Sequence, residues 1–138
     1  MRVLLDTNFI LDFVLARQPF FVKVDENFVK LQNDEFEAFV SPITPINVFY
    51  TTRKEKDKTV AFAVIEELLR LVQITKSDNR IFQNALLLGF KDYEDAVQQE
   101  CAAAENLDAI VTRNTKDHKN ASVKIYSPSV FLQFLQTV

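Results

Sequence analysis

The sequence predicts an α/β protein built around a five-stranded parallel sheet with helices on both faces. Short apolar segments rich in branched side chains alternate with longer segments of helical periodicity, a pattern typical of parallel strands joined by right-handed crossovers. Gly89 is the only glycine, which argues against an all-β fold with many tight turns. At 138 residues and 48% hydrophobic content, the chain is expected to form one domain, 1–138, with its own core.

The expected elements follow in order along the chain. They are a strand at 3–5, helices at 9–15 and 20–31, a strand at 36–40, a helix from Pro45 to about Arg53, a helix at 59–70, a strand at 71–74, a helix from 77–78 to about Leu88, a helix from Asp92 through 104, strands at 109–111 and 123–125, and a helix at 128–135.

Local signals justify the first elements. The strand at 3–5 is apolar and stops at Asp6, after which Asn8 suits the cap of the following helix. A proline within 17–19 ends that helix. The next helix carries apolar side chains at helical spacing, and the strand at 36–40 follows it.

Later boundaries are set by caps and breakers. Thr44 suits a helix cap and Pro45 the first helical position. Residues 77–78 cap another helix, which Gly89 is expected to end as a left-handed C-cap residue. The small side chains at 101–104 allow close packing of a late helix on the sheet.

Composition excludes several classes of protein. With one glycine, neither a dinucleotide fingerprint nor a Walker loop can be built. Cys101 is the single cysteine and is expected to be a packed small side chain; His118 is the single histidine and is expected on a surface loop, so no zinc cluster is predicted. A signal peptide and a membrane-spanning segment are not recognisable, and we expect a reduced, cytoplasmic, soluble protein.

Net charge is −3, so the chain is not a simple basic nucleic-acid binder. Nucleic acid is still possible as a substrate, because divalent cations in an acidic pocket invert the local sign of the charge.

Polar residues gather at the predicted ends of elements. They are Asp6 after the first strand, Asn47 early in the helix after the second strand, Asp92 and Asp95 at the start of a late helix, and Asn114 and Asp117 after the fourth strand. Because strand carboxyl ends and helix amino ends share one edge of a parallel sheet, these groups can converge there.

Converging carboxylates predict divalent-cation chemistry. They repel one another unless protonated or neutralised by a cation. Oxygen ligands without histidine or cysteine select Mg²⁺ or Mn²⁺. Two such ions about 3.5–4 Å apart clamp the attacking and leaving oxygens of a phosphodiester.

Simpler roles compete for the same residues. Asp6 could only cap its helix, and Asp92 and Asp95 could only favour a helix amino end. The role of Asn47 is open. Arg113 could bind a phosphate or pair with the acids. Three polar residues are expected as caps or hydrogen-bond partners: Thr7, Asn8 and Thr112. Asp12 is expected to be solvated or structural, and the aromatic pairs Phe20-Phe21 and Phe49-Tyr50 are expected in the core, with a partner surface as the alternative.

Four short motifs follow one another along the chain: Leu5-Asp6-Thr7-Asn8 with Asp12, Ser41 through Asn47, Asp92-Tyr93-Glu94-Asp95-Ala96, and Val111-Thr112-Arg113-Asn114 through Asp117. In these motifs and their order the chain resembles PIN-domain proteins, the ribonuclease fold of VapC-type toxins. The resemblance implies a three-layer fold whose strands lie in the order third-second-first-fourth-fifth. It also implies an Mg²⁺- or Mn²⁺-dependent endoribonuclease acting on RNA.

The resemblance also implies roles for particular residues. Asp6 is the central metal ligand and Asp95 the second. The acid after the fourth strand falls on Asn114, with Asp117 three residues later as the charged ligand. The family usually has glutamate where this chain has Asn47, so a second metal would be held more weakly, unless Asp92 or Glu100 restores negative charge.

Three functions remain open on the sequence. The first is a metal-dependent endoribonuclease with catalytic Asp6, Asp95 and Asp117, acting as the toxin of a toxin–antitoxin pair. In that case the resemblance implies a small antitoxin partner and a homodimer. The second is a degenerate PIN domain that binds RNA or a protein partner without efficient cleavage. The third, a receiver-type phosphoryl-transfer domain, fits the order of the motifs poorly.

Overall fold

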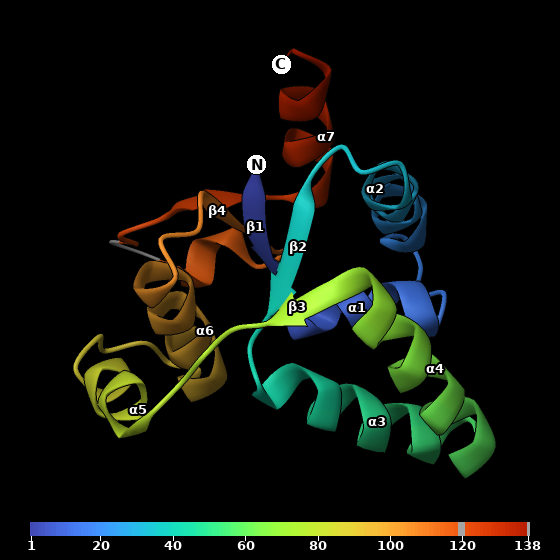
Figure 1. Cartoon of the computed structure of the whole chain (residues 1–138), viewed down its shortest axis with the longest axis horizontal. Helices are drawn as coiled ribbons and strands as arrows, with labels where there is room; N and C mark the ends of the chain where they lie inside the picture. Colours follow the sequence, from blue (N-terminus) through green and yellow to red (C-terminus); the bar gives the residue numbers. More distant parts are fainter. Residues whose placement is uncertain (119–120, 138) are drawn as a thin grey trace.

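The computed structural model of the chain describes residues 1–118 and 121–137. The elements alternate as predicted (Figure 1). They are β1 (Arg2–Leu5), α1 (Thr7–Val14), α2 (Phe21–Gln32), β2 (Glu37–Val40), α3 (Ile43–Glu55), α4 (Lys58–Leu71), β3 (Val72–Ile74), α5 (Asn79–Leu86), α6 (Tyr93–Ala104), β4 (Ala109–Val111), the 3₁₀ turn η1 (Thr115–Asp117), β5 (Lys124–Tyr126) and α7 (Pro128–Gln136).

The five strands form one parallel sheet in the order β3-β2-β1-β4-β5, which confirms the predicted fold class. β1 lies at the centre, with Val3 opposite Ala38 of β2 on one side and Ala109 of β4 on the other. The chain builds the sheet outward in both directions from β1. The carboxyl ends of β1 and β4 therefore form the switch point where open α/β sheets bind ligands.

Two helical layers cover the sheet, and the pleat of β1 divides the core between them. Val3 and Leu5 point into a core shared with α1, α2, α4 and α7. Leu4 points into a second core, made with α5 and α6, in which Ala96, Val97, Cys101 and Ala102 pack closely on the sheet. Figure 1 shows α5 and α6 on one side of the sheet and α1 to α4 on the other. Cys101 is fully buried, as predicted.

Two helices begin earlier than predicted. α1 starts at Thr7, because the N–H of Ile10 already bonds to the carbonyl of Asp6, and Asn8 therefore lies inside the helix instead of capping it. α3 starts at Ile43 instead of Pro45. Proline is accommodated as the third helical residue because the first four N–H groups of a helix have no intrahelical partner.

Two predictions about loops are wrong. α5 ends at Leu86, because the chain tightens as the N–H of Leu87 bonds to the carbonyl of Asn84. Gly89 lies beyond this end, in the left-handed region at φ 70°. His118 is not on the surface but 5% exposed, with its ring edge-on to Phe90 at 5.7 Å, because an aromatic partner takes it out of solvent.

No helix among the described residues has the length and hydrophobicity required to cross a bilayer.

A candidate metal centre at the carboxyl edge of the sheet

A crevice of about 250 Å³ opens at the carboxyl ends of β1 and β4. We call it the acidic crevice; it is lined by Asp6, Thr7, Asn8, Leu11, Asn47, Thr51, Asp92, Glu94, Asp95, Asn114 and Asp117. α1 and α6 contribute residues from their amino-terminal halves, α3 contributes Asn47 and Thr51 from its second and third turns, and the loop after β4 closes the remaining side. The structure thus brings together the acids and amides that the sequence placed at the ends of separate elements.

Asp6 lies at the floor of the acidic crevice and is 3% exposed. Its backbone N–H bonds to the carbonyl of Val111 at 3.1 Å, which ties it to β4. Its carboxylate accepts hydrogen bonds from Gln98 Nε2 and Thr112 Oγ1, each at 3.1 Å. Within the described residues it makes no capping bond to α1, so the capping interpretation is wrong. These two donors position the carboxylate in the crevice.

Burial raises the pKa of Asp6, and the hydrogen bonds from Gln98 and Thr112 act in the opposite direction. Donors aimed at a carboxylate stabilise its ionised form. No role for Gln98 could be predicted from the sequence alone. It lies three residues after Asp95 on α6, and this helical spacing is the signal that would have placed both on one face.

Asp95 shows most directly that the acids act on one another. It is 8% exposed in the first turn of α6. Burial, followed by the charges of Asp6, Asp92, Asp117 and Glu94, raises the pKa of its carboxyl to about 7. A helix amino end alone would lower this pKa. Burial and, after it, the neighbouring negative charges therefore outweigh the effect of the helix amino end on the pKa of Asp95, and a role limited to the helix dipole does not account for the raised value.

Asp92 combines the two roles considered for it. It is the N-cap of α6, and its Oδ1 accepts the N–H of Asp95 at 3.1 Å. It also lines the acidic crevice. Glu100, the other acid considered as a source of added charge, is not among the residues that line the crevice.

Glu94, and not Glu100, adds negative charge to the acidic crevice. Its Oε2 accepts a hydrogen bond from Asn47 Nδ2, and its Oε1 accepts one from Gln98 Nε2 at 3.3 Å. Burial, followed by the charge of Asp6, raises its pKa. Asn47 is thus a neutral donor to an acid from the facing helix. The spacing of four residues between Glu94 and Gln98 could have predicted their contact along α6. It could not have predicted the hydrogen bond from Asn47 on α3.

The loop after β4 completes the acidic crevice. Thr112 is fully buried; besides donating to Asp6, its Oγ1 accepts the N–H of Asn114 at 3.1 Å, which confirms the expected hydrogen-bonding role. η1 then turns the chain so that Asn114 and Asp117 both line the crevice. Thr7 bonds through its hydroxyl to Thr44 Oγ1 at 2.8 Å and links α1 to α3.

Arg113 turns away from the acidic crevice. Its Nε lies 3.2 Å from Oδ2 of Asp12, and its guanidinium stacks on the ring of Phe20 at 4.0 Å. Asp12 is 1% exposed. Of the two roles expected for it, the structural role is therefore confirmed and the solvated one is wrong. Of the two roles considered for Arg113, pairing with an acid is the one present.

The chemistry of the donor set suits a hard divalent cation. The acidic crevice carries five carboxylates and three amides, which come from α1, α3, α6 and the segments that follow β1 and β4. None of these acids pairs with a lysine or arginine among the described residues. As the side chains stand, no three of the described Asp, Glu, His or Cys groups form a closed ligand cage. The crevice is therefore a ring of acids around a shared space.

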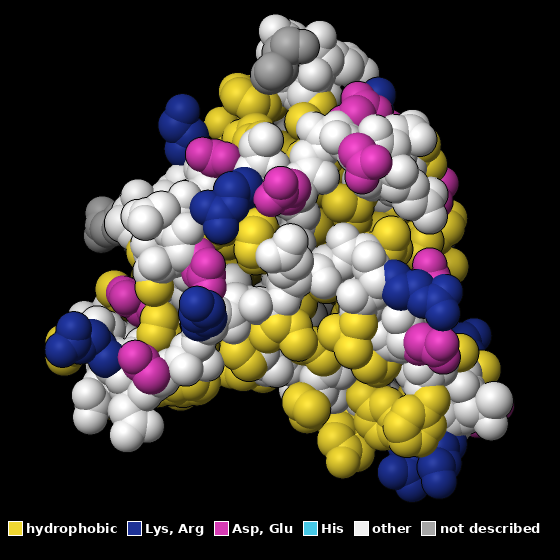
Figure 2. Space-filling model, in the orientation of Figure 1, with side chains coloured by type: hydrophobic (Ala, Val, Ile, Leu, Met, Phe, Trp, Pro, Cys, Tyr) yellow, Lys and Arg dark blue, Asp and Glu magenta, His cyan; other side chains and the backbone are white. Residues whose placement is uncertain are grey.

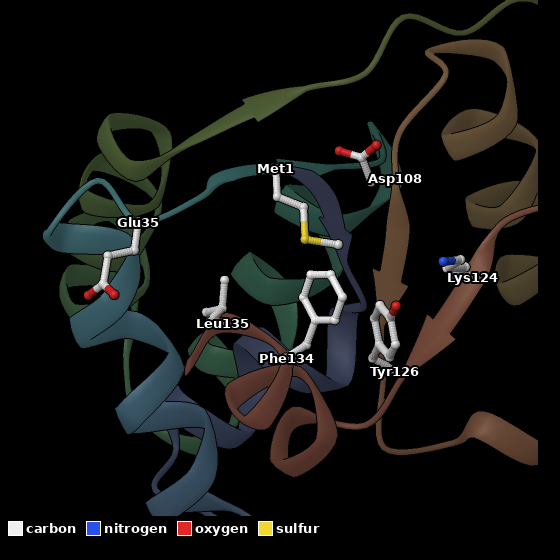
Figure 3. Close-up of a pocket in the computed structure, with 7 residues that line it drawn as sticks. All are labelled: Met1, Glu35, Asp108, Lys124, Tyr126, Phe134 and Leu135. Carbon is white, nitrogen blue, oxygen red and sulfur yellow. The ribbon is translucent and has the colours of Figure 1, made fainter. Parts of the chain in front are cut away.

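A larger cavity, of about 590 Å³, lies at the opposite, amino edge of the sheet. Figure 3 shows Met1, Phe134 and Tyr126 together on one side of this amino-edge cavity, with Glu35 pointing away from them. The other lining residues are Asp108, Lys124 and Leu135. Its acids already have partners: Glu35 pairs with Lys30 at 3.5 Å, and Asp108 accepts the N–H of Arg2 at 2.8 Å.

Comparison with known protein families shows to which family this chain belongs. A sequence model of the PIN domain matches residues 2–116. The chain belongs to the PIN-domain family. Among curated proteins, none matches the sequence of this chain.

Solved structures share the PIN fold with this chain. A chain of VapBC2 from Rickettsia felis, solved with a DNA fragment from its promoter, aligns over 92% of this chain and 98% of its own with a TM-score of 0.71 and 17% identity. VapBC-1 from nontypeable Haemophilus influenzae aligns over 94% and 99%, with a TM-score of 0.71 and 17% identity. Mycobacterium tuberculosis VapC20, a toxin that cleaves the sarcin-ricin loop, aligns over 78% and 86%, with a TM-score of 0.64 and 10% identity. At these identities the likeness is one of fold.

Proposed function

We propose that this PIN domain is an Mg²⁺- or Mn²⁺-dependent endoribonuclease that hydrolyses RNA phosphodiester bonds in the cytoplasm, with 1–138 acting as one unit. One observation carries the proposal. Acids from the ends of β1 and β4 and from α6 converge on one crevice, where burial together with the neighbouring acids raises the pKa of Asp95 to about 7. Structural stability does not call for such crowding, since buried like charges are costly. A divalent cation and a phosphodiester account for it.

The residues present fit a hard cation. Asp6, Asp95 and Asp117 would hold it, with the amide oxygen of Asn114 beside them and Glu94 supplying the charge that Asn47 lacks. When bound, such an ion supplies positive charge to the scissile phosphate and activates water for attack. Gln98 and Thr112 fix the direction of the Asp6 carboxylate, and groups that orient ligands in this way typically contribute about 10–100-fold to metal affinity or activity.

The test is cleavage of single-stranded RNA with Mg²⁺ or Mn²⁺, comparing the wild type with Asp6→Asn. We expect product with the wild type and a loss of about 1,000-fold or more in the variant, since an amide keeps the shape of Asp6 but removes its charge. Equal cleavage by both proteins would contradict the proposal.

A second function is favoured by one specific observation: Asn47 and Asn114 stand where the family resemblance implies acids. In that case the PIN domain binds RNA or a protein partner without efficient cleavage. Tight RNA binding by wild type, with the RNA intact after long incubation in Mn²⁺, would favour it. Turnover that depends on Asp6 would dismiss it.

We also propose that the chain is the toxin of a toxin–antitoxin pair. Similar folds occur in toxin–antitoxin complexes from Klebsiella pneumoniae and in VapBC assemblies. The partner would be a small antitoxin, encoded by a short neighbouring reading frame. Co-expression should rescue growth that the toxin alone arrests. Failure of co-expression to restore growth would contradict the pairing.

A homodimer is the proposed form of the free protein. Large apolar side chains lie exposed on α3 and α4: Ile46 at 59%, Tyr50 at 61% and Phe62 at 56%. Figure 2 shows the hydrophobic surface over these two helices. Tyr50 was expected in the core and is not, which favours the partner-surface alternative. Sedimentation should show a dimer for wild type and a monomer for Tyr50→Glu, whereas Leu87→Glu, at the exposed position just after α5, should remain dimeric. A monomeric wild type would contradict the dimer.

A further inference from the structure

A second pocket lies beside the acidic crevice and has the opposite charge. It measures about 210 Å³ and is lined by Asp12, Pro19, Phe20, Lys23, Arg113, Ser127, Pro128 and Ser129. We call it the basic pocket. Its two cations, Arg113 and Lys23, outnumber its one acid, and that acid is buried beneath them.

The two pockets share a wall. Asn114 lines the acidic crevice, and its neighbour Arg113 lines the basic pocket. On α1, Leu11 faces the crevice and Asp12 the basic pocket. A single strand of nucleic acid that enters one pocket therefore needs to cross only the loop after β4 to reach the other.

Arg113 is held in a fixed orientation before any ligand arrives. Asp12 pairs with its Nε, and Phe20 supports one face of the guanidinium. Asp12 has a second cationic neighbour, Arg17, at 3.9 Å, so the carboxylate does not depend on Arg113 alone. The side chain of Arg113 is 27% exposed. A guanidinium held on its Nε side leaves its terminal N–H groups for a planar, bidentate anion.

Further groups around the basic pocket also favour an anion. Lys23 reaches it from α2 with a side chain that is 52% exposed. Its Nζ lies 3.8 Å from Oε2 of Glu26 in a surface ion pair, which an exposed lysine exchanges for a phosphate at little cost. The amino end of α7 points into it, with Ser127 as the N-cap and the exposed Ser129 in the first turn. Helix amino ends and hydroxyl groups are common partners of phosphate.

We propose that the basic pocket binds an RNA backbone phosphate next to the scissile one, with Arg113 and Lys23 as its contacts. This inference rests on the proposed ribonuclease function. It explains how a chain with a net charge of −3 binds the negatively charged backbone of RNA. Asp12 and Phe20 are positioning residues that act through Arg113. Recognition is of the phosphate and therefore independent of base sequence.

The experiment measures binding of a fluorescent single-stranded RNA in the non-cleaving Asp6→Asn background, over a range of salt concentrations. Arg113→Ala should weaken binding about tenfold. The slope of log affinity against log salt should fall in magnitude by about 0.7, the value for one lost phosphate contact on a single strand. Arg70→Ala is the matched control, because Arg70 is an exposed cation on α4 paired with Glu66 and Glu67.

Two further variants guard against misfolding, since Arg113→Ala leaves Asp12 buried with one fewer partner. Lys23→Ala changes an exposed side chain and should reduce affinity and salt slope in the same way, by a smaller amount. Arg113→Lys keeps the charge but loses the planar fork, and should bind at an intermediate level. In cleavage assays with Asp6 intact, both should raise KM more than they lower kcat.

The results distinguish a failure of the proposed phosphate site from a failure of the proposed ribonuclease function. If Lys23→Ala and Arg113→Lys match Arg70→Ala in affinity and slope while the wild type still cleaves RNA in an Asp6-dependent way, the basic pocket is a structural ion pair only. If the wild type neither binds nor cleaves RNA, the proposed function itself has failed.

Discussion

The two edges of the sheet carry pockets of opposite kinds. The amino-edge cavity is more than twice as large, at about 590 Å³ against about 250 Å³ for the acidic crevice. Its acids are paired, whereas the acids of the crevice share one space without a cationic partner among the described residues, and burial followed by the neighbouring acids raises the pKa of Asp95. We infer that the proposed site is marked by unneutralised charge at the switch point of the sheet and not by the size of the cavity.

The difference follows from the direction of the strands. Every strand in this parallel sheet ends at the carboxyl edge, and the helices that follow begin there, so polar groups from distant segments meet. Beside the amino-edge cavity, Phe134 of α7 is half-buried and stacks at 5.6 Å on Tyr126, whose side chain reaches the cavity from the last residue of β5. We infer that the amino edge contributes packing and the carboxyl edge contributes chemistry.

The strongest way to break this comparison is to exchange one acid at each edge. Asp95→Asn should lower RNA cleavage by about 1,000-fold, about 4 kcal/mol in the barrier, because it removes a proposed metal ligand. Asp108→Asn, at the amino-edge cavity, should stay within about twofold of the wild type. Rates under single-turnover conditions provide the measurement. A comparable loss in both variants would remove the distinction.

A smaller effect is expected from the groups that orient Asp6. Gln98→Leu removes the donor to both Asp6 and Glu94 and should lower cleavage about 10–100-fold. Gln99→Leu is the matched control, since Gln99 is an equally buried neighbour on α6. Activity titrated against Mn²⁺ should show a weaker apparent affinity for Gln98→Leu alone. Unchanged metal dependence would assign Gln98 to packing.

The amino edge should show the converse behaviour. Phe134→Ala removes half of the stack with Tyr126 and should lower the free energy of unfolding by about 2 kcal/mol, below the range for a fully buried phenylalanine. Cleavage per folded molecule should not change. Urea unfolding and the RNA assay on the same preparation test both statements. A loss of activity at full folding would give the amino edge a role in the chemistry.

The smallest effect is a pH dependence confined to the acidic crevice. Asp95 has a pKa of about 7 in the folded protein against an ordinary value of 3.8, so the folded state binds more protons than the unfolded state between those values. The free energy of unfolding without metal should therefore fall as pH rises from about 4 to about 7. The full shift of Asp95 corresponds to about 4 kcal/mol, and solvent screening in the open crevice reduces its contribution to the order of 1 kcal/mol. Raised pKa values of Asp6 and Glu94 add to the same direction.

Variants at the two edges of the sheet show which acids cause the change of the free energy of unfolding with pH. Asp95→Asn should flatten it, and Asp108→Asn should leave it as in the wild type. Urea unfolding in chelator at several pH values is the measurement. If the free energy of unfolding rose between about pH 4 and about pH 7 instead, the ionised acids would have stabilising partners in the folded protein. That result would contradict a cluster of unneutralised acids in the crevice.

Much of the fold could be predicted because it depends on local signals. Branched apolar runs give the strands, and helical periodicity and caps such as Asp78 and Ser127 give the helices. Boundaries failed where a tertiary or backbone hydrogen bond overrides the cap preference, as at Thr44, whose hydroxyl bonds to Thr7. His118 failed because burial against Phe90 depends on a contact between separate loops.

The site could be predicted in part for the same reason. Asp6, Asp95 and Asp117 stand at element ends, which the sequence reveals. Glu94 escaped because its role depends on Asn47, 47 residues away on a facing helix. The partner of Arg113 likewise required knowing that α1 lies beside the loop after β4. Pairings across elements of this kind have no local signal in a single sequence.

Calorimetric titration with Mn²⁺ tests the central claim most directly, since it asks whether the carboxyl-edge acids hold a divalent cation. The measurement compares wild type, Asp6→Asn and Asp108→Asn at pH 7.5, where Asp95 is mostly ionised. We predict binding to wild type and Asp108→Asn alike, and a loss of at least about tenfold in affinity for Asp6→Asn. Equal Mn²⁺ binding by Asp6→Asn and wild type, or loss of binding in Asp108→Asn, would contradict the assignment of the metal centre to the acidic crevice.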